Sequence, residues 1–231
     1  MSDRAAVLAS LARVVAASPS DEPLTRRMCR ACVAILGVEG GSITLSYDTP
    51  QRITLCATDD LAERLDDLQE VIGEGPSYWA YAQGQQVHTE VDGGADARWP
   101  QFAEAVKREI GSMCIYAVPI IPGAEVIGVS TFYRRDRADL LLDPDTRRLL
   151  INAVGVALLG DPALTATADE SQSWTGRAEV SQATGMVMAQ LRLAPADALA
   201  LLRAHAYAQS TSLSEVSAAV VTRRLDFTAT D

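Results

Sequence analysis

One face of a predicted helix near the C-terminus carries small, polar and basic residues at regular spacing. At 100° per residue, a stripe about 80° wide is expected to hold Arg177, Ser181, Thr184, Met188 and Arg192. It lies away from the apolar face of the same helix. A solvated helix face is one interpretation, and contact with an anionic partner is the other.

A second pair of residues on the following helix has types that suit nucleic acid. Tyr207 could stack on an unpaired base, while Arg177 and Arg203 could take phosphates or a guanine edge. The alternative is a helix end with a solvated arginine and a packed tyrosine.

Catalytic or metal-binding spacing is not evident in the sequence. We find no Ser/His/Asp order with supporting loops, no carboxylate pair in an apolar context and no phosphate loop, so we predict that the protein is not an enzyme. Cys29-x-x-Cys32 lies in a helical pattern without a second pair at ligand spacing. We therefore expect buried structural thiols and no metal site.

The elements that carry the first two groups are three short helices between Trp174 and Leu225. Pro195 suits the first turn of the second helix, and Ser212-x-x-Glu215 is typical of a capping box that starts the third. Apolar residues recur at helical spacing in each, and the predicted core is Val180, Ala183, Val187, Leu191, Ala198, Leu199, Leu202, Ala206, Leu213, Val216, Val220 and Val221.

This segment resembles the ANTAR domain of transcription antitermination regulators. The resemblance rests on Arg177-Ala178, Gln182 to Met188, Ala198, Leu202-Arg203, Ala206, Leu213-x-x-Val216 and Val220-Val221. It implies binding to paired hairpins in nascent RNA, and the residues that we expect to take part are Arg177, Ser181, Thr184, Gly185, Arg192, Arg203 and Tyr207. Thr184 replaces the family's usual lysine, which removes one charge that could contact phosphate.

Charge is distributed unevenly along the chain. The net charge is −10, but residues 1–173 hold 15 Lys and Arg against 25 Asp and Glu, whereas residues 174–226 hold 5 Arg against 4 acids. A nearly neutral unit binds RNA weakly by electrostatics alone. Either local clustering of its arginines suffices or two copies act together, so we expect a homodimer.

The first 160 residues predict an α+β domain. Helices are expected at 3–17, 23–36, 59–70, 101–109 and 144–159 and near Tyr78, and strands at 42–47, 52–57, 86–89, 111–120 and 125–133. We expect an antiparallel sheet with helices packed on one face. Gly73-Glu74-Gly75-Pro76 is interpreted as a structural turn, since Glu74 would repel phosphate.

This order, together with Gly73 to Pro76, Arg98-Trp99-Pro100 and Ile127-Gly128-Val129, resembles a GAF domain. The resemblance implies a small-molecule sensor and dimerisation module, although the cyclic-nucleotide signature of some members is not visible and no cofactor can be assigned. We expect the effector pocket to involve Tyr78, Trp79, His88, Trp99 and Phe102. Aromatic core packing and a satisfied strand histidine are the alternatives. A thiol reductase that uses pocket cysteines is the one enzymatic alternative, and Cys114 in an apolar strand argues against it.

The sequence thus predicts a GAF sensor domain (1–160), a linker (161–173) and a three-helix ANTAR domain (174–231). We expect a cytoplasmic, homodimeric antitermination regulator without a membrane segment. The alternative is a signalling adaptor whose helices dock on a protein. DNA binding by the last two helices is disfavoured, because the third helix is too apolar to recognise a major groove.

Overall fold

The computed structural model describes residues 4–46, 52–92, 98–137, 140–161 and 172–228. The chain divides into two compact units, one made of residues 1–69 and 74–164 and the other of residues 70–73 and 165–231. Each unit has its own hydrophobic core. Most of the expected linker lies outside the described residues.

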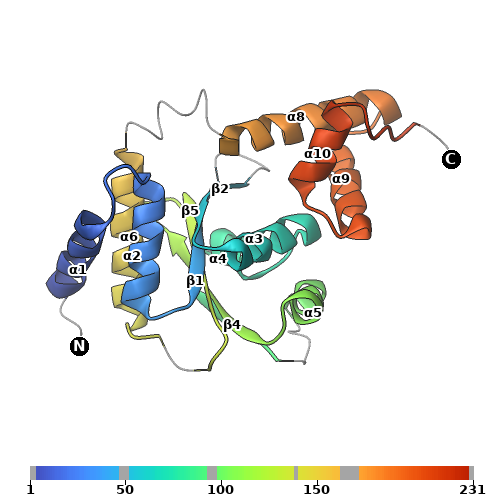
Figure 1. Cartoon of the computed structure of the whole chain (residues 1–231). Coiled ribbons are helices and arrows are strands. Elements are labelled where there is room, and N and C mark those ends of the chain that lie inside the picture. The colour runs from blue at the N-terminus through green and yellow to red at the C-terminus, as the bar shows by residue number, and fades with distance from the viewer. Residues whose placement is uncertain (1–3, 47–51, 93–97, 138–139, 162–171, 229–231) are drawn as a thin grey trace. The chain divides into compact units, whose positions relative to one another are not determined.

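A five-stranded antiparallel sheet forms the centre of the first unit (Figure 1), in the order β2-β1-β5-β4-β3. Its strands are β1 (Gly40–Ser46), β2 (Arg52–Ala57), β3 (Val87–Val91), β4 (Met113–Ile120) and β5 (Gly128–Arg134). The consecutive strands β1 and β2, and likewise β4 and β5, pair in antiparallel orientation, as the predicted antiparallel sheet requires. Pairing of β1 with β5 joins them, and β3 forms one edge.

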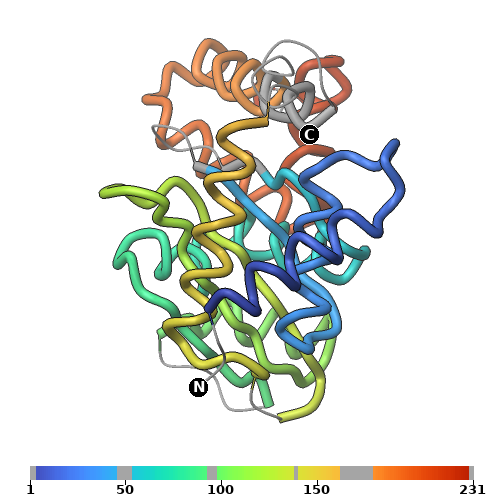
Figure 2. The backbone as a smooth tube through the Cα atoms, turned by 90° about the vertical axis from the view of Figure 1, so that its left-hand side faces the viewer, coloured from blue at the N-terminus to red at the C-terminus, as the bar shows by residue number. Residues whose placement is uncertain are grey.

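Helices cover both faces of this sheet, so the expectation of helices on one face was wrong. One face carries α1 (Arg4–Ala17), α2 (Leu24–Leu36) and α6 (Pro144–Leu159), with α1 and α6 in front in Figure 2. The other carries α3 (Asp60–Ile72), α4 (Pro76–Gln83) and α5 (Pro100–Glu109). All eight residues of β4 are buried. A strand that is apolar along its whole length must be covered on both faces. The continuous apolar run of β4 was therefore the sequence signal that indicated helices on both faces of the sheet.

The two faces differ in chemistry. Ile43 and Phe132 belong to the apolar core beneath α1, α2 and α6. Thr44, next to Ile43 in the strand, points to the other face, where its hydroxyl donates to Asp66 of α3 at 3.1 Å. Successive strand residues face opposite sides, so the α3 side of the sheet is lined partly by buried hydroxyl groups.

The segment Gly73 to Pro76 is a structural turn, as predicted. Gly75 has φ 144° and precedes Pro76, the first residue of α4. The Glu74 carboxylate accepts the backbone N–H groups of Gln101 (2.8 Å) and Phe102 (3.0 Å), and so caps the start of α5. An acid stabilises a helix N-terminus by accepting its unsatisfied amides. Glu74 therefore connects the turn that precedes α4 with the first turn of α5.

The second unit consists of α8 (Gln172–Leu191), α9 (Pro195–Gln209) and α10 (Leu213–Val221). Ser212 and Glu215 form the expected capping box, and Pro195 occupies the first turn of α9. Ten of the twelve predicted core residues are buried, and Leu191 and Val221 are partly buried against them. The sequence interpretation missed the C-terminal tail, where Leu225 and Phe227 also pack on this core.

Among the described residues, no single helix is long and apolar enough to span a membrane. The pair Glu179–Leu191 and Pro195–Gln209 has the combined length and composition, but it is bent by 106°.

Candidate functional site

The exposed face of α8 is built from small residues. Ser181 and Gly185 are exposed and Thr184 is half-buried. Residues three and four apart share one helix face, so these three lie together. The Thr184 hydroxyl donates to the Val180 carbonyl at 2.7 Å, which holds the side chain against its own helix. This leaves a shallow surface without long side chains at its centre.

Gly185 is not explained by the packing of the second unit. A Cβ atom placed there would meet no described atom within 4 Å. Glycine in a helix interior costs about 1 kcal/mol relative to alanine. Because no neighbour excludes a methyl group, the position is open for the close approach of a molecule outside the fold.

At one end of the predicted stripe the structure differs from the prediction, and at the other end the side chain lies outside the described residues. Arg192 is not part of the helical stripe, because α8 ends at Leu191 and Arg192 turns the chain with φ 56°. This left-handed residue redirects the backbone before Pro195 begins α9. The side chain of Arg177 lies outside the described residues.

On α9, Arg203 and Tyr207 are one turn apart on the same side of the helix. Arg203 is half-buried, and Tyr207 is 50% exposed. About half of the Tyr207 surface is therefore open to a partner, and its role in binding stays a prediction. Its neighbour His205 does pack, with its ring edge-on to Phe227 at 5.6 Å. The Phe227 N–H donates to the Gln190 side chain of α8 at 3.3 Å, so the tail contacts both α8 and α9.

The sheet separates the residues expected to form an effector pocket. Trp99 and Phe102 are 5% and 1% exposed, on the side of α3, α4 and α5. Tyr78 and Trp79 are half-buried on α4. His88 is exposed and lies on the opposite face, stacked on Tyr116 with ring centroids 4.5 Å apart. One pocket cannot hold His88 together with Trp99 and Phe102, and a pocket role for the other four stays a prediction.

A buried carboxylate on the α3 side was missed by the sequence interpretation. Asp66 is 6% exposed, and its Oδ2 accepts the hydroxyls of Thr44 (3.1 Å) and Thr54 (3.2 Å). Its Oδ1 is buried without a hydrogen-bond partner among the described residues. Asp66 appeared to belong to an exposed charged helix, and the hydroxyls alternating along the strands were the only signal. Because Oδ1 of Asp66 can still accept a hydrogen bond, it could bind a donor group of a ligand.

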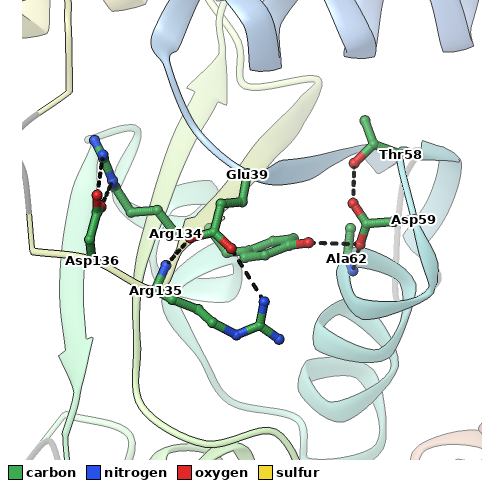
Figure 3. Close-up of polar contacts among 8 residues, drawn as sticks. Glu39, Thr58, Asp59, Ala62, Arg134, Arg135 and Asp136 are labelled. Carbon is green, nitrogen blue, oxygen red and sulfur yellow. Dashed lines mark hydrogen bonds and ion pairs between the residues drawn. The ribbon is translucent and has the colours of Figure 1, made fainter.

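A second polar cluster on this side is structural (Figure 3). Asp59 accepts the Tyr133 hydroxyl (3.0 Å), the Thr58 hydroxyl (2.7 Å) and the Ala62 N–H (2.9 Å) at the start of α3. Burial and the hydrogen bond to Asp59 raise the pKa of Tyr133 above its usual value. Nearby, Glu39 accepts the backbone N–H of Arg135 at 2.6 Å. These contacts join β1, β5 and α3.

The four cysteines are reduced thiols, and Cys29 and Cys32 are fully buried. A hydrogen bond with Cys56 and burial raise the pKa of Cys29, and burial raises the pKa of Cys32. Such thiols are poor nucleophiles because they stay protonated. The predicted structural role of the Cys-x-x-Cys pair is consistent with this burial.

A third group lies at the β3 edge of the sheet, on the face that carries α6. The ligand atoms of His88, Glu90 and Cys114 all lie within 4.8 Å of one another. Beside them is a cleft of about 280 Å³, lined by residues that include His88, Tyr116, Pro144, Arg147 and Arg148. The sequence interpretation missed this group, because only the alternation of His88 and Glu90 was visible and their pairing with Cys114 was not.

Comparison with known proteins identifies the two units. The family model of the ANTAR domain matches residues 171–221. The GAF domain of a Coxiella burnetii phosphoenolpyruvate-protein phosphotransferase is 12% identical, with a TM-score of 0.48, over 71% of this chain and 95% of that one. The GAF domain of the Acinetobacter phosphoenolpyruvate-protein phosphotransferase is 14% identical, with a TM-score of 0.46, over 69% and 97%. No curated protein sequence matches the chain.

The chain thus combines a mixed helix-and-sheet unit, similar in arrangement to GAF domains, with a C-terminal helical unit. Residues 171–221 belong to the ANTAR domain family. The predicted ANTAR domain is confirmed by this match, and the first unit has the predicted mixed helix-and-sheet fold.

Proposed function

We propose that this protein is an RNA-binding regulator of transcription antitermination rather than an enzyme. Its ANTAR domain would bind paired hairpins in nascent transcripts, and its GAF-like domain would respond to a signal. The ANTAR family match supports RNA as the partner class. Such a protein would act in the cytoplasm, where nascent transcripts are made.

The observation that carries this proposal is the exposed small-residue face of α8. Gly185 is a destabilising choice in a helix interior, and no described neighbour requires it. Ser181 and Thr184 flank it and keep the surface shallow. An RNA loop could therefore approach the helix closely, with Tyr207 of α9 available to stack on a base.

Arginines would supply the electrostatic part of the binding. Arg203 and the predicted contacts Arg177 and Arg192 are few, and the unit carries little net charge. A homodimer would offer two such surfaces to two adjacent hairpins and gain avidity from the linkage. By binding the antiterminator more tightly than the terminator, the protein would shift the RNA equilibrium, because equal affinity for both folds shifts nothing.

A protein partner is the second candidate for the same surface. The absence of lysine at position 184 and the low net charge favour it, since a protein partner needs no phosphate contacts. The two candidates differ in salt dependence. Affinity for RNA falls steeply with salt because counterions are released from phosphates.

Binding of the full chain to a labelled RNA with two adjacent small-loop hairpins tests the proposal. A single-hairpin RNA is the control, and salt is varied from about 50 to about 200 mM. We expect tight, salt-sensitive binding that requires both hairpins. Arg177→Ala with Arg203→Ala should weaken binding about tenfold or more and reduce the salt slope by about two.

Arg26→Ala is a matched control, since Arg26 lies on α2 in the first unit and its ion pair with Glu22, at 3.9 Å, is long. It should leave RNA binding unchanged. Equal binding to both RNAs at both salt concentrations would contradict the RNA proposal and favour a protein partner.

A further inference from the structure

The β3 edge of the sheet, on the face that carries α6, brings together three different metal-ligating groups, of which His88 and Glu90 are exposed and Cys114 is buried. His88 and Glu90 alternate along β3, so both side chains leave the same face. Cys114 pairs directly with Glu90 across β3 and β4. Directly opposite residues are about 5 Å apart at Cβ, and diagonal ones remain in reach of long side chains. The ladder itself therefore fixes the convergence of the three groups.

We propose that His88, Glu90 and Cys114 form a binding site for a divalent metal ion, with Zn²⁺ as the preferred ion. Imidazole, thiolate and carboxylate are its usual protein ligands, at about 2.0–2.3 Å from the ion. In a tetrahedral site such ligands are about 3.3–3.7 Å apart. The ligand atoms, all within 4.8 Å of one another, therefore need to approach by up to about 1 Å, and rotation of the exposed Glu90 side chain can supply this movement.

The surroundings of the three residues favour this assignment. The His88 ring is stacked on Tyr116 with an interplanar angle of 13°, which restricts its orientation. Ligands held in place by neighbouring groups bind metals more tightly. The cleft beside His88 and Tyr116 leaves space for water or another ligand in a fourth position. Three protein ligands and one open position are typical of a zinc site that exchanges ligands.

Arg137 is the cation that the metal would replace. Its guanidinium lies 3.5 Å from Glu90 and 2.7 Å from Asp92, and all three side chains are largely exposed. Exposed ion pairs contribute little to stability. Glu90 can therefore exchange this partner for a metal ion at low cost, and the arginine can stay with Asp92.

Cobalt titration of the full chain under reducing conditions tests the site, because Co²⁺ takes zinc positions and absorbs when bound to thiolate. We expect one Co²⁺ per chain, a thiolate-to-cobalt charge-transfer band and loss of this band when Zn²⁺ is added. Cys114→Ser should abolish the band. His88→Gln and Glu90→Gln should each weaken binding at least about tenfold.

Cys56→Ser is the matched control, because Cys56 is a partly buried thiol of β2 outside the cluster. It should keep the band and the affinity. Arg137→Gln should tighten binding several-fold by releasing Glu90. Circular dichroism of each variant verifies that it is folded.

The proposal is overturned if a folded Cys114→Ser variant keeps the band, if Cys56→Ser loses it, or if Glu90→Gln binds with unchanged affinity. It does not depend on RNA binding, so its failure would leave the proposed function of the second unit untouched.

Discussion

Two glycines lie in the interiors of long helices for opposite reasons. In α6, a Cβ at Gly155 would lie 2.3 Å from Cγ2 of Ile120, a fully buried residue of β4. In α8, a Cβ at Gly185 would meet no described atom within 4 Å. The first glycine is required by packing within its own unit. For the second, no described neighbour sets such a requirement, and the proposed RNA contact would supply one.

This contrast extends to the regions around the two glycines. The interior of the first unit is closely packed on both faces of its sheet, and its polar groups serve joints such as that between Asp59 and Tyr133. The exposed face of α8 is open and has few long side chains. Substitutions that add or remove small groups should therefore affect stability in the first region and binding in the second.

The largest expected effect is at Gly155. Gly155→Ala should lower the free energy of unfolding of the first unit by about 2 kcal/mol, because overpacking against Ile120 outweighs the gain in helix propensity. Chemical denaturation measures this. Gly160→Ala at the end of α6 is the control, since its nearest new contact would be at 3.6 Å, and it should change stability by less than about 0.5 kcal/mol. Equal effects at both positions would remove the packing explanation.

Tyr133 tests the interior further. Tyr133→Phe should cost about 1 kcal/mol at neutral pH, since Asp59 loses one donor. The raised pKa of Tyr133 means that its neutral form stabilises the fold below pH about 10, where an unfolded tyrosine is also neutral. The difference between the native protein and the variant should therefore shrink as the pH rises above about 10. Tyr81→Phe, at an exposed site on α4, should show neither effect.

In the second unit, stability is expected to come from the core and the helix caps. Ser212→Ala removes half of the capping box of α10 and should cost the second unit about 1 kcal/mol. Ser214→Ala, at an exposed position inside the same helix, should cost less than about 0.5 kcal/mol. Thermal unfolding of the two variants compares them, and a larger loss at Ser214 would contradict the assignment of the cap.

The smallest expected effect is at Thr184, and it concerns binding rather than stability. Thr184→Lys should raise RNA affinity a few-fold and steepen the salt dependence by about one phosphate contact. Stability should change by less than about 0.5 kcal/mol, because the side chain leaves the helix surface. An unchanged salt slope would place position 184 outside the RNA contact.

The sequence predicted local features well and spatial pairings poorly. Pro195 and the Ser212–Glu215 box marked the helices of the second unit because caps involve residues only three or four positions apart. By contrast, Cys114 joins His88 and Glu90 only through the pairing of β3 with β4. Asp66 was missed for the same reason, since its partners are on strands that lie before it in the chain.

For the predicted sites, too, local features could be predicted from the sequence and spatial relations could not. The types of residue on the α8 face were foreseen from helical spacing, but the end of the helix at Leu191, which excludes Arg192, was not. The separation of His88 from Trp99 and Phe102 follows from strand alternation and the position of α5. The spacing of His88, Trp99 and Phe102 along the chain does not show on which face of the sheet each side chain lies.

The most direct test of the central claim is Gly185→Ala, with unfolding and RNA binding measured on the same preparation. We expect the second unit to gain about 0.5–1 kcal/mol, because alanine is the better helix former and meets no described neighbour. We expect affinity for the two-hairpin RNA to fall at least about tenfold, because the methyl group blocks close approach. A variant that is more stable and binds RNA as tightly as the native protein would contradict the account.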